Sequence, residues 1–198
     1  IYAPMSHIVT EEPRRESMEK KVVVWGTGNV GRPAIRSVVA NKDLDLAGVL
    51  VQNPDKVGKD AGDLAGIEST GIAATDDISI ALESDIDAVV YTVNADFRPM
   101  ESLDEAETLL RHGKNVVTAS FYPLYHPPSM PEDLADRFAS ACAEGIASIF
   151  ASGIDPGWTC DILPLLLAGV SADITEIRSR ELMNYALYDQ PDAVRNLV

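Results

Sequence analysis

Short apolar runs alternate with amphipathic stretches along most of the chain. The runs are rich in valine and isoleucine, which predicts strands buried on both faces. Between them, apolar residues recur at helical spacing, and glycine, proline or an acidic residue marks many of the helix ends. This regular alternation predicts an α/β protein with a doubly wound parallel sheet. The predicted strands are Lys21–Trp25, Leu44–Val51, Ile86–Val93, Asn115–Ala119 and Ile146–Ala151.

The first predicted strand leads directly into a glycine-rich turn. The sequence Gly26-Thr27-Gly28-Asn29-Val30-Gly31 has G-x-G-x-x-G spacing, with a strand before it and a helix after it. Gly26 permits a sharp turn, Gly28 permits the backbone to approach a pyrophosphate, and Gly31 permits the helix to press on the strand. The free N–H groups that open the helix would face phosphate oxygens. The six residues therefore predict a Rossmann-type dinucleotide site, with a purely structural glycine-rich turn as the alternative.

The second predicted strand ends without the acidic residue that holds the ribose hydroxyls in NAD-preferring Rossmann domains. It ends at Gln52 and Asn53, and Lys56 and Lys59 follow. The missing acid removes a repulsion against the 2′-phosphate of NADP, and the lysines could attract that phosphate. We therefore expect Asn53 and Lys56 near the adenosine ribose, and NADP rather than NAD as the cofactor. The alternatives are a site that accepts both forms, and lysines that only face solvent.

Loops that follow the strands supply the remaining candidates, because ligands of such sheets bind beyond the carboxyl ends of the strands. Thr92 and Asn94 are expected to line the cofactor, or else to serve as turn residues. After the fourth strand, His126 is the candidate proton carrier and Tyr122 the candidate donor to a carbonyl oxygen. Packing on a proline-rich loop is the alternative for both. Asp155 is a candidate catalytic residue, or else the cap of the helix that follows it.

Composition and charge exclude several classes of protein. The chain of 198 residues is 46% hydrophobic and 24% charged, as in ordinary globular proteins. Its net charge of −15 argues against nucleic acid as a partner. We expect no membrane span and no signal sequence, and hence a cytoplasmic protein. Cys142 and Cys160 lack metal-ligand spacing, as do the histidines, so no metal site is predicted.

The pattern changes at both ends of the chain. Residues 1–20 mix prolines with charges and predict a mobile arm. Residues 21–170 hold the predicted Rossmann domain. From Ile174 to Tyr188, β-forming and polar residues predict one long strand, the first of a different sheet. Residues 171–198 are therefore expected to begin a truncated α+β C-terminal domain.

Three segments together resemble one family of oxidoreductases. They are the first strand with its glycine-rich turn (Val23–Gly31), the segment Pro54–Gly62, and the loop Ser152–Gly157 with the sequence Ser-Gly-Ile-Asp-Pro-Gly. The chain is similar to the dihydrodipicolinate-reductase-like family, in the group of 2,4-diaminopentanoate dehydrogenase and the native amine dehydrogenases. The resemblance implies an NAD(P)-dependent dehydrogenase with an N-terminal Rossmann domain, and a C-terminal domain that completes the substrate site and a homodimer.

The sequence also departs from that family. The amine dehydrogenases are expected to carry a glutamate after the fourth strand, where this chain has Ser120–His126 without a carboxylate, and the paired histidines of true dihydrodipicolinate reductases are absent. We expect hydride transfer between nicotinamide and a small carbonyl, imine or amine compound. A dinucleotide-binding module or sensor without catalysis is the alternative. A Rossmann-like methyltransferase is disfavoured, because the second strand lacks a terminal acid.

Overall fold

The computed structural model describes residues 19–188 and 191–196. The chain divides into two compact units, with the boundary after Ser152. The first unit contains one sheet flanked by helices, and the second contains helical turns and irregular segments. Residues 1–18 of the predicted arm lie outside the described residues, and the predicted domain bounds stay a prediction.

Within the described residues, five parallel strands form the sheet in the order β2-β1-β3-β4-β5. Val24 of β1 pairs with Val49 on one side and with Val90 on the other. The order reverses at β1, because the chain first goes out to β2 and then crosses back to β3. This is the predicted doubly wound topology, in which ligands bind at the reversal point. The strands are β1 Lys20–Trp25, β2 Leu44–Leu50, β3 Ala88–Tyr91, β4 Asn115–Thr118 and β5 Ile149–Ala151.

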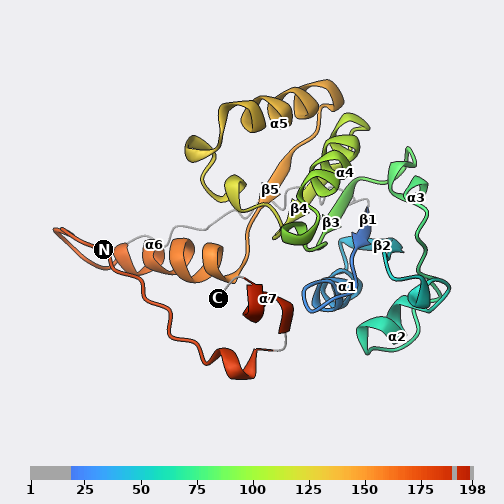
Figure 1. The fold of residues 1–198 in the computed structure, drawn as a ribbon, viewed down its shortest axis with the longest axis horizontal. Helices are drawn as coiled ribbons and strands as arrows, with labels where there is room; N and C mark the ends of the chain where they lie inside the picture. The colour runs from blue at the N-terminus through green and yellow to red at the C-terminus, as the bar shows by residue number, and fades with distance from the viewer. Residues whose placement is uncertain (1–18, 189–190, 197–198) are drawn as a thin grey trace, which may run out of the picture. The chain divides into compact units, whose positions relative to one another are not determined.

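Helices cover both faces of the sheet (Figure 1). On one face, Val22 and Val24 pack with Ile35 of α1 and with α2. On the other face, Val23 and Trp25 pack with α3, α4 and α5. Successive side chains of a strand point to opposite faces, so the apolar run of β1 supplies both cores. The helices of this unit are α1 Gly31–Ala40, α2 Ala61–Ala65, α3 Ser79–Leu82, α4 Pro99–Arg111 and α5 Glu132–Gly145.

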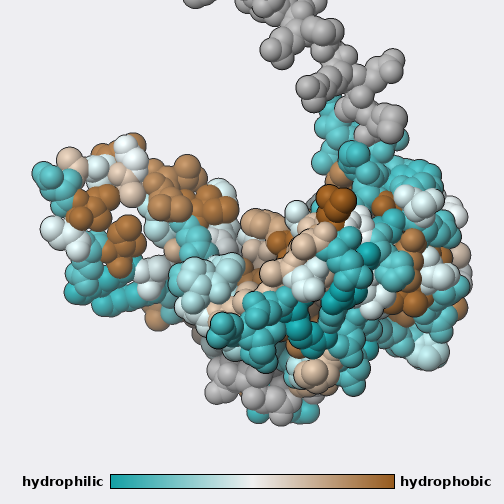
Figure 2. All heavy atoms as spheres, turned by 90° about the horizontal axis from the view of Figure 1, so that it is seen from above, coloured by the Kyte–Doolittle hydropathy of each residue, from teal (hydrophilic) through white to brown (hydrophobic). Residues whose placement is uncertain are grey.

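No described residue of the second unit belongs to a buried hydrophobic cluster. The segment Ile154–Ile162, whose backbone is not helical at residues 155–157, leads into α6 (Leu163–Ala168), and α7 spans Pro191–Asn196. Among the side chains described in this unit, only Gly157 is a buried position. The leucines of α6 at positions 165–167 are 59–70% exposed, and Figure 2 shows apolar side chains gathered at the surface over this helix. Hydrophobic burial therefore stabilises this unit far less than the first.

The prediction of a long strand over Ile174–Tyr188 is wrong. The segment is irregular apart from a short 3₁₀ helix, Tyr185–Leu187, where Asn184 Oδ1 accepts a hydrogen bond from the Ala186 N–H at 3.1 Å. A strand needs a neighbour for its backbone hydrogen bonds, and no described segment pairs with this one. β-forming side chains alone do not supply that neighbour.

Asp60 connects α2 to the loop that follows it. Its carboxylate accepts hydrogen bonds from the N–H groups of Gly62 (2.7 Å), Thr70 (3.0 Å) and Gly71 (2.8 Å), and from the Ser69 hydroxyl (3.0 Å). These bonds stabilise the ionised carboxylate, with the Thr70 N–H first among them, and lower the pKa of Asp60 from 3.8 to about 2. The Asp60 carboxylate therefore joins the start of α2 to residues 69–71 of the loop.

We expect Asp60 to make folding stability depend on pH below about 4. Because its pKa is lower in the folded chain than in the unfolded chain, its contribution is complete above pH 3.8 and is lost as the pH falls toward about 2. An Asp60→Asn variant lacks this titration, so its deficit in stability relative to wild type should shrink toward about pH 2. Urea unfolding of both proteins across that range, followed by circular dichroism, measures the effect. A deficit that stays constant with pH would contradict it.

Candidate functional site

The ends of β1, β2 and β3 are linked where the glycine-rich turn begins. The Thr92 N–H, directly after β3, donates to the Trp25 carbonyl at 2.8 Å, and the Thr92 hydroxyl donates to the same oxygen at 2.9 Å. The Gly26 N–H donates to the Leu50 carbonyl of β2 at 2.9 Å. These bonds hold the turn at the reversal point of the sheet.

Each glycine of the turn has its own structural reason. Gly26 has a φ of 114°, in the region that favours glycine. A Cβ at Gly31 would overlap the backbone carbonyl of Gly26, so α1 packs directly against the turn. A Cβ at Gly28 would meet no atom within 4 Å. Gly26 and Gly31 therefore shape the fold, whereas Gly28 leaves open space, as the motif predicts.

Helix α1 begins at this turn without a neutralising side chain. Its N-cap residue, Val30, forms no side-chain capping hydrogen bond, and its first turn holds no acidic residue. The other described helices of ten or more residues, α4 and α5, carry Glu101 in one case and Glu132 and Asp133 in the other. Asn29 and Val30 complete the turn before α1. The first turn of α1 therefore holds no acid that would neutralise its positive end, and this end can attract an anion.

Asn53 and Lys56, both predicted near the adenosine ribose, lie in the loop after β2. Asn53 Oδ1 accepts a hydrogen bond from the Asp55 N–H at 2.9 Å and so caps a short 3₁₀ helix, Pro54–Lys56. The Lys56 ammonium donates to the carbonyl and hydroxyl oxygens of Thr27, at 3.1 and 3.0 Å. The structure brings Lys56 to the glycine-rich turn, and contact of either residue with a ribose stays a prediction.

Thr92 and Asn94, predicted to line the cofactor, both make contacts within the protein. The Thr92 hydroxyl lies against the positions where Gly26 and Gly31 lack a side chain. Asn94 Oδ1 accepts a hydrogen bond from the Asp96 N–H at 3.0 Å and caps a short 3₁₀ turn. Both residues follow β3 at the expected edge, and a role in cofactor binding stays a prediction.

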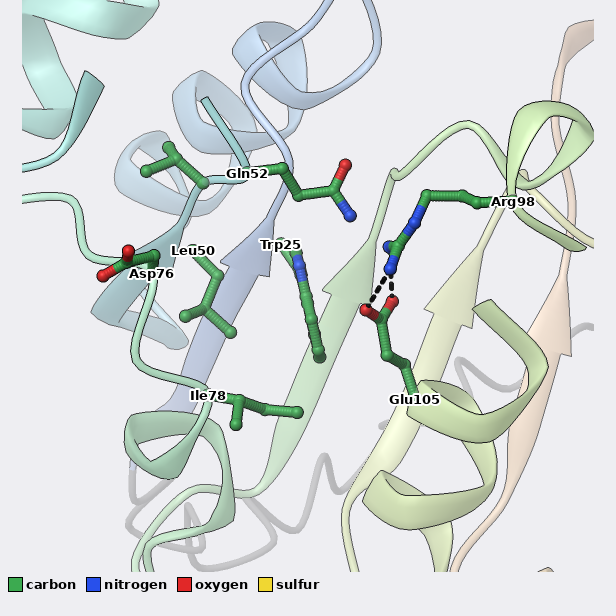
Figure 3. Close-up of a pocket in the computed structure, with 8 residues that line it drawn as sticks. Trp25, Leu50, Gln52, Asp76, Ile78, Arg98 and Glu105 are labelled. Atoms are coloured by element: carbon green, nitrogen blue, oxygen red, sulfur yellow. Dashed lines mark hydrogen bonds and ion pairs between the residues drawn. The ribbon is translucent and has the colours of Figure 1, made fainter. Parts of the chain in front are cut away.

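Sequence reasoning missed a pocket beside Trp25 (Figure 3). It has a volume of about 520 Å³ and lies at the carboxyl ends of β1 and β2. In Figure 3 the Trp25 ring stands between Ile78 and the Arg98–Glu105 pair, and the Gln52 amide extends toward Arg98. Apolar and polar side chains thus face one space. The lining residues are Trp25, Leu50, Val51, Gln52, Asp76, Ile78, Arg98 and Glu105.

A hydrogen-bond network fixes Arg98 at this pocket. Two bonds join its guanidinium to Glu105, at 2.8 and 3.0 Å, and the Tyr91 hydroxyl donates to the same carboxylate at 2.5 Å. Burial first, and then the bond to Glu105, raises the pKa of Tyr91, and Glu105 also raises the pKa of Arg98. The phenol therefore stays protonated and the guanidinium charged. The spacing of Arg98 and Glu105, about two helical turns, was the only sequence signal for the pair.

Tyr122 and His126 lie exposed in the loop after β4. His126 Nδ1 lies 2.6 Å from Ser129 Oγ, and the Tyr122 ring lies 6.2 Å from the ring of Tyr125. The Tyr125 hydroxyl donates to the Ala119 carbonyl at 3.4 Å. These contacts lie within the loop and its immediate start, and a role in proton transfer stays a prediction for Tyr122 and His126.

Asp155 belongs to the second unit and does not cap the helical segment there, so that alternative is wrong. Its backbone is not helical (φ −150°, ψ 105°), and its carboxylate accepts a hydrogen bond from the Cys160 thiol. It also hydrogen-bonds to Glu181, which raises the pKa of Glu181. The carboxylate is bound to side chains of its own unit instead of the N–H groups at the start of a helix. A catalytic role for Asp155 stays a prediction.

The part of the chain that the structure describes holds no group of three His, Cys, Asp or Glu side chains able to bind a metal ion. Cys142 and Cys160 are both free thiols. No described helix combines the length and the apolar character needed to cross a bilayer.

The strand order, its reversal at β1 and the open turn that starts α1 define a Rossmann-type dinucleotide-binding fold. Comparison with known proteins shows to which family with this fold the chain belongs. The family model described as "Dihydrodipicolinate reductase, N-terminus" matches residues 20–120. The chain belongs to this family, as its sequence motifs indicated.

Two curated relatives and one solved structure illustrate the similarity. An amine dehydrogenase of Streptomyces virginiae is 49% identical over 177 residues, which is 89% of this chain and 49% of that protein. The 2,4-diaminopentanoate dehydrogenase of Acetoanaerobium sticklandii is 24% identical over 176 residues, which is 83% of this chain and 47% of that protein. The structure of an amine dehydrogenase from Mycobacterium smegmatis matches with a TM-score of 0.62 at 27% identity, over 79% of this chain and 45% of that one. The chain thus spans about half the length of these curated relatives.

Two glycine substitutions should separate the structural part of the turn from its open part. In Gly31→Ala the new methyl group collides with the Gly26 carbonyl, and we expect a loss of about 1–3 kcal/mol in unfolding free energy. In Gly28→Ala the methyl group enters open space, and we expect a change within about 0.5 kcal/mol. Urea unfolding of both variants measures the difference. Equal losses would mean that Gly28 is also packed.

Proposed function

We propose that this protein is an NAD(P)-dependent oxidoreductase that transfers a hydride between nicotinamide and a small carbonyl, imine or amine compound. The observation that carries the proposal is the uncapped, positive start of α1, which meets open space at Gly28. The names of the relatives, amine dehydrogenase and 2,4-diaminopentanoate dehydrogenase, favour a catalyst over a dinucleotide sensor.

The residues present fit a dinucleotide. Its diphosphate would lie over Gly28–Gly31, at the positive end of the α1 dipole and beside the open space at Gly28. The adenosine end would enter the pocket beside Trp25, with Arg98 as a fixed polar contact. The nicotinamide end would extend toward Thr92 and the ends of β3 and β4. Bound nicotinamide would supply the site that gives or accepts the hydride.

Groups for the accompanying proton transfer lie in the loop after β4. The bond between His126 Nδ1 and Ser129 Oγ orients the imidazole. We propose His126 as the group that gives or takes the proton, and Tyr122 as a donor to the substrate oxygen or nitrogen. This arrangement would replace the carboxylate that the loop lacks.

NADP is the cofactor we favour. The chain leaves β2 through Gln52 and Asn53, and the Asn53 side-chain oxygen is engaged with the Asp55 N–H. Positions 52 and 53 hold no acid that would accept both ribose hydroxyls. This supports NADP binding without excluding NAD. Homodimer formation by the whole protein stays a prediction from the family resemblance.

Titration with NADPH and with NADH tests the proposal. Trp25 lies at the pocket, so a bound nicotinamide cofactor should quench its emission and accept its excitation energy. We expect saturable binding to wild type and at least about tenfold weaker binding to Gly28→Ala, because its methyl group fills the space for the diphosphate. A folded wild-type chain that binds neither cofactor would refute the proposal. Binding without turnover of any amine, imine or carbonyl compound by the whole protein would favour the sensor.

An acid placed after β2 should shift the cofactor preference. In Asn53→Asp the side chain still caps the Asp55 N–H but adds a negative charge, so we expect the NADPH:NADH affinity ratio to fall by about tenfold or more. Asn41→Asp is the matched control, because Asn41 Oδ1 accepts from the Asp43 N–H at 3.0 Å in the same way, at the end of α1 far from its turn. Fluorescence titration gives the dissociation constants of both cofactors for wild type and the two variants. An equal change in both variants would contradict the role of Asn53.

A further inference from the structure

The loop after β2 has a defined conformation that delivers Lys56 to the glycine-rich turn. The Lys56 N–H donates to the Asn53 carbonyl at 3.0 Å, which closes the 3₁₀ turn that Asn53 also caps with its side chain. Gly58 follows with a φ of 81°, and its N–H donates to the Ala74 carbonyl at 2.7 Å. Backbone bonds on both sides of Lys56 therefore set the direction in which its side chain leaves the loop.

The contact between Lys56 and Thr27 joins this loop to the centre of the turn. Thr27 lies between Gly26 and Gly28 and is only 7% exposed, so its two oxygens need hydrogen-bond donors. Both receive one from the Lys56 ammonium. An ammonium has three N–H donors, and the two bonds to Thr27 leave one for a further acceptor.

Within the described residues no acid forms an ion pair with Lys56, although the chain carries a net charge of −15. Some cations of the first unit form ion pairs, as in Lys20–Asp87 and Arg98–Glu105, whereas Lys114, like Lys56, donates to neutral oxygens. The described partners of the Lys56 ammonium are neutral oxygens of Thr27 alone. This positive charge therefore adds to that of the uncapped start of α1, which begins four residues after Thr27.

We infer that Lys56 is a positioning residue for the cofactor's diphosphate. It holds the turn at Thr27 in the conformation that receives the diphosphate, and it contributes a positive charge that acts on NAD and NADP alike. The inference rests on the proposed function. It differs from the expectation that Lys56 attracts the 2′-phosphate, which only NADP carries.

Hydrogen–deuterium exchange tests the contact without any cofactor. In Lys56→Met the two bonds to Thr27 are lost, and we expect faster exchange in the peptide that covers residues 26–31. Lys59→Met is the matched control, because it removes the same charge from an exposed side chain of the same loop. The control should leave the exchange of residues 26–31 unchanged. Equal exchange in Lys56→Met and wild type would overturn the inference, whatever the protein binds.

Binding constants for NADH and NADPH test the diphosphate assignment. We expect Lys56→Met to weaken both by a similar factor, about ten- to a hundredfold, because a charged hydrogen bond and the order of the turn are lost together. Lys56→Arg should recover part of the affinity for both. Weakening confined to NADPH would overturn the inference in favour of the 2′-phosphate. If wild type binds neither cofactor, the proposed function fails while the exchange result still reports on the contact.

Thr27→Val extends the test to a variant that keeps the lysine. It removes the hydroxyl acceptor and retains the carbonyl, so we expect about three- to tenfold weaker binding of both cofactors. Adding Lys56→Met to this variant should cost less than the product of the two single effects, because both changes break one contact. Independent effects that multiply in full would show that Lys56 acts without Thr27 and would overturn the inference.

Discussion

The packing of α1 against the glycine-rich turn is the contact on which the rest of the site depends. At Gly31 the helix backbone approaches the Gly26 carbonyl so closely that no side chain fits between them. The Thr92 hydroxyl, directly after β3, lies at the same position, and the Gly26 N–H donates a hydrogen bond to the Leu50 carbonyl of β2. One close contact thus aligns the axis of α1 with the reversal point of the sheet, and the helix N–H groups point where three strands end.

Electrostatics follows from this arrangement in an otherwise acidic chain. Elsewhere in the first unit, Asp87 pairs with the Lys20 cation, and Asp60 accepts hydrogen bonds from backbone N–H groups. At the start of α1 the helix has no such partner, and Lys56 adds a positive charge held by neutral oxygens. The start of α1 and Lys56 thus place positive charge at one position of a chain whose net charge is −15.

The sequence predicted those parts of the fold that depend on local pattern. Valine runs that suit two buried faces and helices that begin after glycine or proline lie close to where the structure has them. The roles of Gly26, Gly28 and Gly31 followed from backbone geometry alone. The pocket did not, because Tyr91, Arg98 and Glu105 meet only after a strand, a turn and a helix have packed. The strand over Ile174–Tyr188 failed for a related reason, since pairing depends on a second segment that no local pattern reveals.

The glycine-rich turn and the loop that carries His126 differ in the hydrogen bonds that hold them. Bonds between β1, β2, β3 and α1 fix the groups for the dinucleotide, whereas His126 is held by Ser129 inside one exposed loop. The other described histidine, His112, binds the Thr108 carbonyl at the end of α4, away from the carboxyl ends of the strands. If the proton that accompanies hydride transfer passes through an imidazole of the described chain, it therefore passes through His126. The loop that carries His126 and the glycine-rich turn share no hydrogen bond among the described residues, so a displacement of this loop would leave the turn in place.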